Sequence, residues 1–243
     1  GQAGTPLTFN LAKKGTVALI EKNKIGGTCL NNGCVPTKTY IASARRAWDA
    51  INGEEFGIEI PKGTKTNLTK VKQRKENLIN ASREGIEKSL SENENITLFR
   101  GEAHFISDYV VSINGEEITA QNVFINVGGR ALVPNEYKDI PHFTNENILE
   151  TTTLPEHLII IGGSYIGLEF GQMFARFGSK VTIIERGSKL IGREDDEVSQ
   201  VVEEIVKSDG VEIIFNAEEI KASKNNDNTI TVQTSTSNTN SIT

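Results

Sequence analysis

The sequence has few cysteines, few prolines and no long apolar run, and each scarcity excludes a class of protein. Two cysteines among 243 residues are too few for the disulfide framework of a secreted domain, so we expect a reducing, cytoplasmic setting. Six prolines argue against a Pro-rich disordered chain. No apolar stretch approaches the roughly 18 residues of a membrane span, and no signal peptide is recognisable.

The sequence also lacks a long run of basic residues. The formal net charge is −6, and the chain has no run of five or more basic residues. Both observations argue against a nucleic-acid partner. Hydrophobic residues make up 37% and charged residues 24% of the chain, enough for a packed core. The length corresponds to one large domain or two small ones.

Both cysteines fall within one short segment, "GGTCLNNGCVPTK" at 26–38. On an ideal helix, Cα atoms five residues apart are separated by roughly 8.6 Å, more than the ~6.8 Å that a disulfide spans. A bond between Cys29 and Cys34 therefore requires an unwound turn, and residues 31–33, Asn-Asn-Gly, tolerate such distortion. A strained bond exchanges readily, and a nearby helix N-terminus is expected to lower the pKa of the thiols.

Two other roles for the cysteine pair stay open. The pair could form half of a zinc site, but zinc ligands are usually two to four residues apart, and His104, His142 and His157 are scattered. It could also be an inert structural bond, although so short a loop would constrain little chain. The spacing favours a redox-active pair without a bound metal.

The remaining patterns predict regular elements with identifiable ends. The expected elements are a helix over 1–14, a strand over 16–21, an amphipathic helix over 67–90 with Asn67 as its N-cap, short strands between 96 and 127 with a tight turn at Asn114-Gly115, and a connector over 131–157. Residues 221–243, rich in Asn, Ser and Thr, show no terminating element. We therefore expect an internal piece of a longer protein.

An internal repeat contains two dinucleotide-binding patterns. In the second copy, Gly162, Ser164 and Gly167 occupy the glycine positions of G-x-G-x-x-G, and Glu185 follows Gly167 by 18 residues. In the first copy, Gly1 and Gly4 match the last two glycines and Glu21 follows Gly4 by 17 residues. Such a turn brings backbone N–H groups to a pyrophosphate, and the acid accepts ribose hydroxyls.

The two acids also bear on nucleotide choice. A carboxylate at Glu185 repels a 2′-phosphate and so favours NADH, whereas the adjacent Arg186 could bind that phosphate. The alternative is that the glycines serve only close helix–strand packing, an alternative that the side chain of Ser164 supports. Glu21 and Glu185 would then be solvated carboxylates at strand ends.

The segment "GGTCLNNGCVPTK" resembles the redox-active disulfide signature of the class I pyridine nucleotide–disulfide oxidoreductases, the family of dihydrolipoamide dehydrogenase, glutathione reductase and mercuric reductase. The resemblance extends over essentially the whole chain through "GEAHF" at 101–105, "VFINVGGR" at 123–130 and "IIIGGSYIGLEF" at 159–170. "NVFINVGGRALVP" and "GGSYIGLEF" lean towards the mercuric-reductase-like branch. The chain has Asn-Val-Gly at 126–128 where the family usually has Ala-Thr-Gly, so one hydroxyl contact is lost.

The resemblance implies a role for each matching residue. Cys34 would lie against the flavin as the charge-transfer thiolate, and Cys29 would attack the substrate. Lys38 would sit near the flavin and pair with Glu169, and Tyr165 would cover the nicotinamide face of the flavin as a gate. The implied FAD contacts are Gly1, Gly4, Glu21, Lys22, Gly27, Thr28, Lys38, Ala103 and Gly128; the implied NAD(P)H contacts are Gly162, Gly163, Ser164, Tyr165, Ile166, Gly167, Glu185 and Arg186.

The resemblance also implies an architecture and an activity. The fold would be α/β, with two incomplete Rossmann-like domains and a small antiparallel meander: an FAD domain over 1–150 without its first strand, and an NAD(P) domain over 151–243. Electrons would pass from NAD(P)H through FAD to the cysteine pair and on to a small-molecule disulfide or metal ion. The family's acid–base pair and dimerisation domain match nothing here, although the full protein would be a homodimer.

Two other functional hypotheses stay open. The protein could be an NADH oxidase or diaphorase that makes little use of the disulfide. The chain could also be a nucleotide-binding fragment without turnover. The sequence does not identify the acceptor among lipoamide, glutathione, mercuric ion and others.

Overall fold

The computed structural model describes residues 1–235, and its chain divides into two compact units. Unit 1 comprises Gly1–Pro36 and Arg74–Arg130, and unit 2 comprises Thr37–Gln73 and the chain from Ala131 onward. Two of these boundaries fall within the helices over Cys34–Ile51 and Leu68–Ser91, and the third falls between residues 130 and 131. The division into an FAD domain over 1–150 and an NAD(P) domain over 151–243 stays a prediction.

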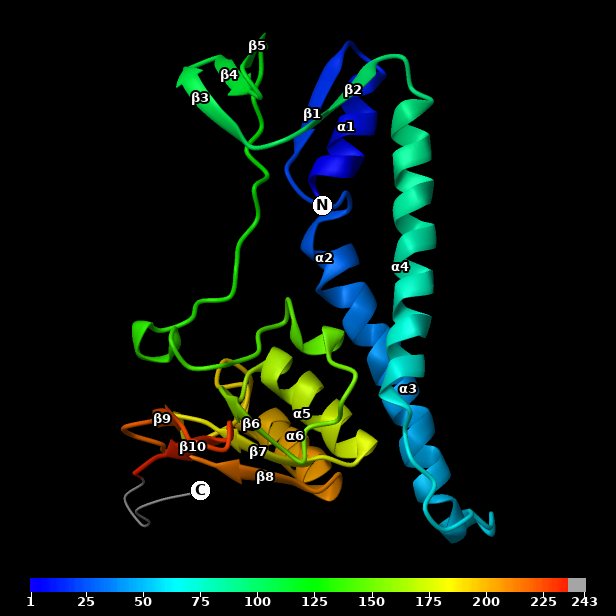
Figure 1. The fold of residues 1–243 in the computed structure, drawn as a ribbon, viewed down its shortest axis with the longest axis vertical. Helices are drawn as coiled ribbons and strands as arrows, with labels where there is room; N and C mark the ends of the chain where they lie inside the picture. The colour runs from blue at the N-terminus through cyan, green and yellow to red at the C-terminus, as the bar shows by residue number, and fades with distance from the viewer. Residues whose placement is uncertain (236–243) are drawn as a thin grey trace. The chain divides into compact units, whose positions relative to one another are not determined.

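Unit 1 is built on a pair of parallel strands, β1 (Val17–Glu21) and β2 (Ile96–Arg100). Helix α1 (Gly4–Ala12) packs beside both strands (Figure 1). A small core joins them, formed by Ala12, Ile25, Leu90 and Ile96. The predicted helix–glycine–strand order at the start of the chain is confirmed.

Three helices connect β1 to β2: α2 (Gly27–Asn31), α3 (Cys34–Ile51) and α4 (Leu68–Ser91). The side-chain Oδ1 of Asn67 accepts a hydrogen bond of 3.0 Å from the backbone N–H of Lys70, so the predicted cap and helix over 67–90 are confirmed. No helix among the described residues is both long and apolar enough to cross a membrane.

An antiparallel meander follows, formed by β3 (Ala103–Ser107), β4 (Val110–Ile113) and β5 (Glu116–Thr119). Between β4 and β5, Asn114 and Gly115 both have positive φ, 53° and 84°. Two consecutive positive φ values characterise the type I′ turn whose twist suits a two-residue hairpin, so the predicted tight turn is confirmed.

The prediction of a strand continuing to residue 127 is wrong. After β5, residues 120–131 are not assigned to any strand, and Val127 is 90% exposed. The apolar alternation of "NVFINV" is suited to a sheet, but an extended segment becomes a strand only when another strand satisfies its backbone. No strand of residues 1–235 pairs with this segment.

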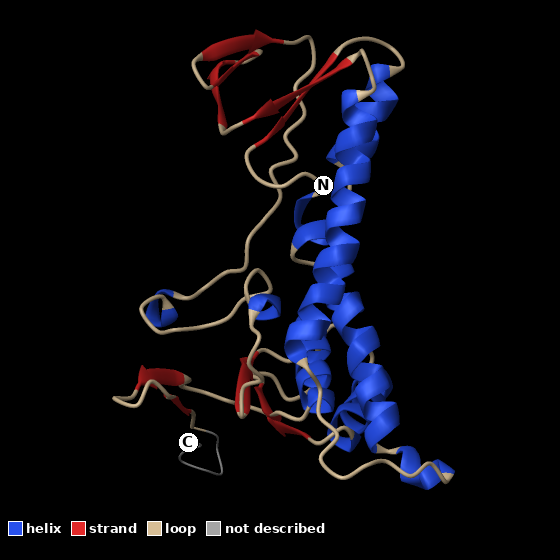
Figure 2. Ribbon diagram, turned by 45° about the vertical axis from the view of Figure 1, so that its right-hand side comes forward, coloured by secondary structure: helices blue, strands red, loops and turns tan. Residues whose placement is uncertain are grey.

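Unit 2 is built on a three-stranded parallel sheet in the order β6 (His157–Ile161), β7 (Lys180–Ile184) and β8 (Val211–Ile214) (Figure 2). Helix α5 (Tyr165–Phe177) connects β6 to β7, and α6 (Asp196–Ser208) connects β7 to β8. Each connection is a β–α–β unit, the arrangement that the second copy of the repeat predicts.

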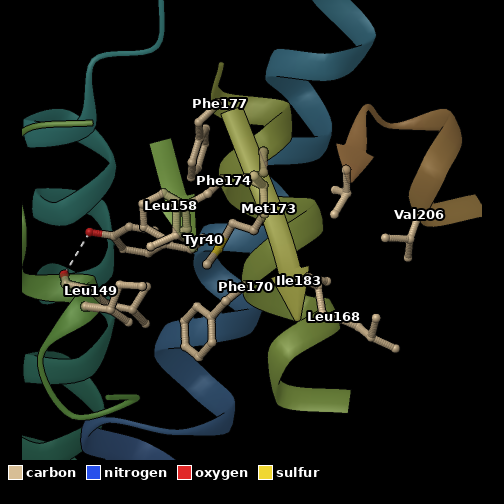
Figure 3. Close-up of a cluster of buried hydrophobic side chains, with 14 of the residues drawn as sticks. Tyr40, Leu149, Leu158, Leu168, Phe170, Met173, Phe174, Phe177, Ile183 and Val206 are labelled. Atoms are coloured by element: carbon tan, nitrogen blue, oxygen red, sulfur yellow. Dashed lines mark hydrogen bonds between the residues drawn. The ribbon is translucent and has the colours of Figure 1, made fainter. Parts of the chain in front are cut away.

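The core of unit 2 joins α3 to this sheet (Figure 3). Tyr40 on α3 is fully buried, and its hydroxyl donates a 2.9 Å hydrogen bond to the carbonyl of Leu149. The rings of Tyr40 and Phe177 lie edge to face with centroids 6.2 Å apart. These contacts bury the apolar face of α5, which carries Phe170, Met173, Phe174 and Phe177.

The connector over 131–157 has little regular structure, as predicted. It holds two short 3-10 turns, η2 (Asn135–Tyr137) and η3 (Ile148–Glu150); a third, η1 (Gly53–Phe56), follows α3. Within the Asn-, Ser- and Thr-rich segment 221–243, for which no terminating element was predicted, β9 (Lys221–Lys224) and β10 (Ile230–Gln233) form a hairpin. Residues 236–243 lie outside the described residues.

Candidate active site

The cysteine segment forms two helices separated by a break. Helix α2 ends at Asn31, Asn32 adopts φ −150° and ψ 27°, and α3 begins at Cys34. The break falls on the Asn-Asn-Gly run whose residue types tolerate distortion. A Cβ at Gly33 would lie 2.9 Å from the carbonyl oxygen of Thr28, so the closely packed turn requires glycine there. The predicted unwinding is confirmed.

The side chains of Cys29 and Cys34 lie close enough to interact across this break. Both cysteines are free thiols, Cys29 half-buried and Cys34 exposed. The sulfurs are therefore placed for a bond between them, whereas the assignment of Cys29 as the attacking thiol stays a prediction.

The predicted lowering of thiol pKa by a helix N-terminus is wrong for Cys29. Its pKa is raised above the ordinary value, first because of the hydrogen bond with the Cys34 side chain and then because of burial. The backbone N–H groups of Cys34 and Val35 do lower the pKa, but the shared proton and the loss of solvent outweigh them.

Three of the chain segments predicted to contact FAD come together in unit 1. A Cβ at Gly27 would lie 2.5 Å from the Cα of Gly1, and a Cβ at Gly4 would lie 3.8 Å from the side-chain amide of Asn126. The glycine turn before α1, the turn before α2 and the segment around Gly128 therefore meet. Thr28, the residue after Gly27, is exposed.

The other FAD candidates of unit 1 lie at the strand ends. Glu21 ends β1, and its carboxylate accepts the backbone N–H of Asn23 at 2.9 Å. Lys22 forms an exposed 3.0 Å ion pair with Glu102, next to Ala103 at the start of β3. The Lys22 ammonium lowers the pKa of the Glu102 carboxyl.

The glycine turn of unit 2 lies between β6 and α5. Gly162 has φ +107°, a conformation that side chains disfavour. A Cβ at Gly167 would collide with the carbonyl oxygen of Gly162, and a Cβ at Gly163 would come within 2.6 Å of Leu190. The turn needs glycine at these positions for packing as well as for access to its backbone. A role of these glycines in helix–strand packing is therefore compatible with a role in nucleotide binding.

Glu185 contacts this turn directly. Its carboxylate accepts the N–H of Gly163 and the N–H of Gly187, each at 2.6 Å. It is therefore not a freely solvated group, and its position at the end of β7 places an acid beside the glycine turn. Arg186 is exposed next to it.

Lys38 and Glu169 form the ion pair that the resemblance implies, joining α3 to α5 within unit 2. Lys38 is largely exposed and Glu169 about one-third exposed. Tyr165 and Ile166, in the first turn of α5, are also exposed, Tyr165 at 67%. Among residues 1–235, no cluster of three His, Cys, Asp or Glu side chains is placed to bind a metal ion.

Backbone groups are accessible near both predicted nucleotide sites. An added Cβ at Gly128 or Gly162 would meet no atom within 4 Å, so the backbone there is accessible. No side chain caps the first N–H groups of α1 or α5. Uncapped N–H groups at a helix N-terminus bind anions such as pyrophosphate.

Asn31 and Arg83 form a contact that the sequence did not predict. Arg83 on α4 donates to the side-chain oxygen of Asn31, between the two cysteines. Arg83 lies on the polar face of an amphipathic helix, and no local pattern relates it to a residue 52 positions away. Only the packing of α4 reveals the pair.

Comparison with known proteins agrees with this geometry. The RclA protein of Escherichia coli, named a probable pyridine nucleotide-disulfide oxidoreductase, is 36% identical, with 89% of this chain and 47% of the relative covered. A dihydrolipoyl dehydrogenase of Bacillus subtilis is 36% identical (88% and 48% covered), and a mercuric reductase of Staphylococcus aureus is 32% identical (88% and 39%). The chain therefore spans about half the length of these relatives or less.

Solved structures give the same result. A Cu(II) complex of the E. coli flavoprotein disulfide reductase RclA superposes with a TM-score of 0.81 at 35% identity, covering 99% of this chain and 52% of the other. The fold is thus α/β and Rossmann-like, as predicted. The family profile described as "Pyridine nucleotide-disulphide oxidoreductase" matches residues 1–243, and the chain belongs to this family.

Proposed function

We propose that this chain is the electron-transfer part of an FAD-dependent oxidoreductase that passes electrons from NAD(P)H through FAD to Cys29 and Cys34, and on to an external acceptor. The observation that carries the proposal is the pair of free, interacting thiols on either side of the break between α2 and α3. Two thiols so placed can close to a disulfide with loss of two electrons and two protons.

Unit 1 would hold the flavin. The backbone around Gly1, Gly4 and Gly27 would bind the pyrophosphate, and Glu21 would accept ribose hydroxyls. Lys22, Thr28, Ala103 and Gly128 complete the proposed FAD contacts. Bound FAD supplies a two-electron carrier that connects a hydride donor to a dithiol.

Unit 2 would hold the nicotinamide nucleotide at the glycine turn before α5, through the backbone of 162–167. Glu185 already accepts two backbone N–H groups, and its remaining lone pairs would accept ribose hydroxyls. Its negative charge disfavours a 2′-phosphate, so we propose NADH as the preferred donor. Arg186 is the residue whose charge opposes this preference.

The other site residues would orient the reacting groups and cover the nicotinamide site. The pairing of Lys38 with Glu169 would hold the ammonium at a defined place on α3, and Tyr165 would cover the nicotinamide site until the nucleotide enters. Cys34 would face the flavin and Cys29 the acceptor. The whole protein would act as a homodimer in the cytoplasm.

For the acceptor, we propose a thiol-binding metal ion. The similarity to a structure titled as a Cu(II) complex and to mercuric reductases supports it, since thiolates are soft ligands that favour copper and mercury ions. Two Cu(II) ions accept the electron pair of one dithiol. A disulfide substrate is the second candidate, supported by the dihydrolipoyl dehydrogenase relatives.

The test is an anaerobic titration of the chain reconstituted with FAD. We expect two electron equivalents of NADH to produce a long-wavelength charge-transfer band between a cysteine thiolate and the flavin. Cys34→Ser should abolish the band. Cys29→Ser should retain it but lower NADH-dependent reduction of Cu(II) or oxidised lipoamide by more than about a hundredfold.

Other outcomes would support the alternatives. Bleached flavin without the band, with no effect of Cys34→Ser, would indicate an oxidase or diaphorase. A chain that binds nucleotide but stays colourless with added FAD would be a binding fragment without turnover. If Cys29→Ser retained turnover and Cys34→Ser retained the band, the two thiol assignments would be reversed.

A further inference from the structure

Asn31 uses all of its side-chain polar atoms within unit 1. Its Nδ2 donates to the carbonyls of Gly27, Ile25 and Lys24 at 2.9, 3.0 and 3.3 Å. Its Oδ1 accepts a forked pair of hydrogen bonds from Arg83, at 2.9 Å from Nη2 and 3.2 Å from Nε. The amide therefore ties the turn before α2 and the helix α4 to the end of α2.

The chemistry of the partners determines the orientation of this amide. Carbonyl oxygens require a donor and a guanidinium requires an acceptor, so Nδ2 faces the 24–27 loop and Oδ1 faces Arg83. Bonds from a guanidinium are stronger than neutral ones. Because Asn31 lies two residues after Cys29 and just before the helix break, these bonds hold the backbone that carries the first sulfur.

We propose that Asn31 and Arg83 are positioning residues for the cysteine pair, forming a clamp that keeps Cys29 and Cys34 within bonding reach. This inference rests on the redox role proposed above for the pair. The reaction that the clamp favours is exchange with a disulfide such as oxidised glutathione: the protein dithiol loses two electrons and two protons to give the Cys29–Cys34 bond, and two molecules of reduced glutathione are released.

The experiment measures this equilibrium on the whole chain in glutathione redox buffers, with alkylation and mass spectrometry to count free thiols. No flavin is needed. We expect Asn31→Leu, which removes every bond of the amide, to lower the equilibrium constant for disulfide formation by about tenfold, since a looser turn lowers the effective concentration of one thiol at the other. Asn31→Asp should have a similar effect, because its carboxylate can still accept from Arg83 but repels the 24–27 carbonyls.

A second set of variants changes Arg83, which is partly exposed on α4. Arg83→Gln should lower the constant by about threefold in the native chain and have no further effect in Asn31→Leu. Arg83→Lys should recover part of the loss. Matched controls are Asn23→Asp, which adds the same charge in the preceding loop, and Lys88→Gln, which removes a charge from the same helix; both should leave the constant within twofold.

The clamp would be disproved if Asn31→Leu, folded by circular dichroism, kept the native equilibrium constant. It would also be disproved if the effects of Asn31→Leu and Arg83→Gln were additive, or if the controls lowered the constant as much. Should Asn31→Leu fail to fold, the comparison of Arg83→Gln with Lys88→Gln decides the question. Failure to bind flavin or oxidise NADH would contradict the proposed function without altering this measurement.

Discussion

Asn31 and Ser199 show opposite outcomes for a polar side chain placed inside the protein. The amide of Asn31 has a partner for each of its polar atoms. The hydroxyl of Ser199 on α6 is buried, with no hydrogen-bond partner among the described residues. A buried group without a partner loses its bonds to water and gains none in return.

Ser199→Ala should therefore stabilise the protein. Removing the unpaired hydroxyl, and placing a better helix former within α6, should raise the free energy of unfolding by about 1 kcal/mol. Urea denaturation measures this change. Ser208→Ala is the matched control, because Ser208 lies on the same helix, is exposed and donates to the carbonyl of Ile205; its effect should stay within about 0.5 kcal/mol. A loss of stability in Ser199→Ala would show that the hydroxyl has a partner.

At the scale of elements, a buried ion pair joins α5 to the end of α6. Arg176 donates to both carboxylate oxygens of Asp209, at 3.1 and 3.0 Å, and Gln172 adds a bond of 2.6 Å. The side chains of Arg176 and Asp209 are 11% and 3% exposed. Arg176 also lies 5.8 Å from the ring centroid of Trp48 on α3, so three helices meet at one guanidinium.

Asp209→Ala should destabilise unit 2 strongly. It leaves the buried guanidinium of Arg176 without its counter-charge, which typically costs about 3–5 kcal/mol. Chemical denaturation of the variant tests this, with Glu203→Ala as the control, since Glu203 on α6 forms a half-exposed i,i+4 bridge with Lys207. The control should lose no more than about 0.5 kcal/mol. Equal losses would indicate that the ion pair contributes little beyond a surface bridge.

At the scale of the whole molecule, stability should depend on pH through one cross-strand network. The ring of His157 on β6 bonds to the hydroxyl of Thr182 on β7, and that hydroxyl donates to Glu212 on β8. Burial, and then the charge of Lys180, lower the pKa of His157 below 6.5. The hydroxyl of Thr182 is the main cause of the lowered pKa of Glu212.

The lowered pKa values of His157 and Glu212 both reduce folding stability as the pH falls. A histidine whose pKa is lowered on folding binds its proton more readily in the unfolded chain, so folding stability falls as the pH decreases below about 6.5. The lowered pKa of Glu212 adds a second loss below about 4.5. Thermal unfolding between pH 5 and 8 should show a decline at the acidic end that is absent in His157→Gln. His142→Gln, at an exposed histidine, should retain the decline; a pH-independent native protein would contradict the network.

Much of the site was predictable because its signals are local. The two glycine turns, the break between Cys29 and Cys34 and the cap at Asn67 each depend on residues a few positions apart, where backbone geometry restricts the residue type. The two acids follow their glycine turns at the fixed spacing of a strand–turn–helix–strand unit. The predicted pairing of Lys38 with Glu169 came from the family resemblance rather than from any pattern of charge. Family membership followed from these same motifs.

What the tertiary structure decided is which distant groups meet. The clamp from Arg83 to Asn31, the engagement of Glu185 with Gly163 and the raised pKa of Cys29 all depend on packing between segments far apart or on the sharing of one proton. The missing strand at 120–127 has the same cause, since a strand exists only where another supplies its hydrogen bonds. Local residue types thus determined the turns and helices, whereas long-range pairing determined which side chains are satisfied, buried or charged.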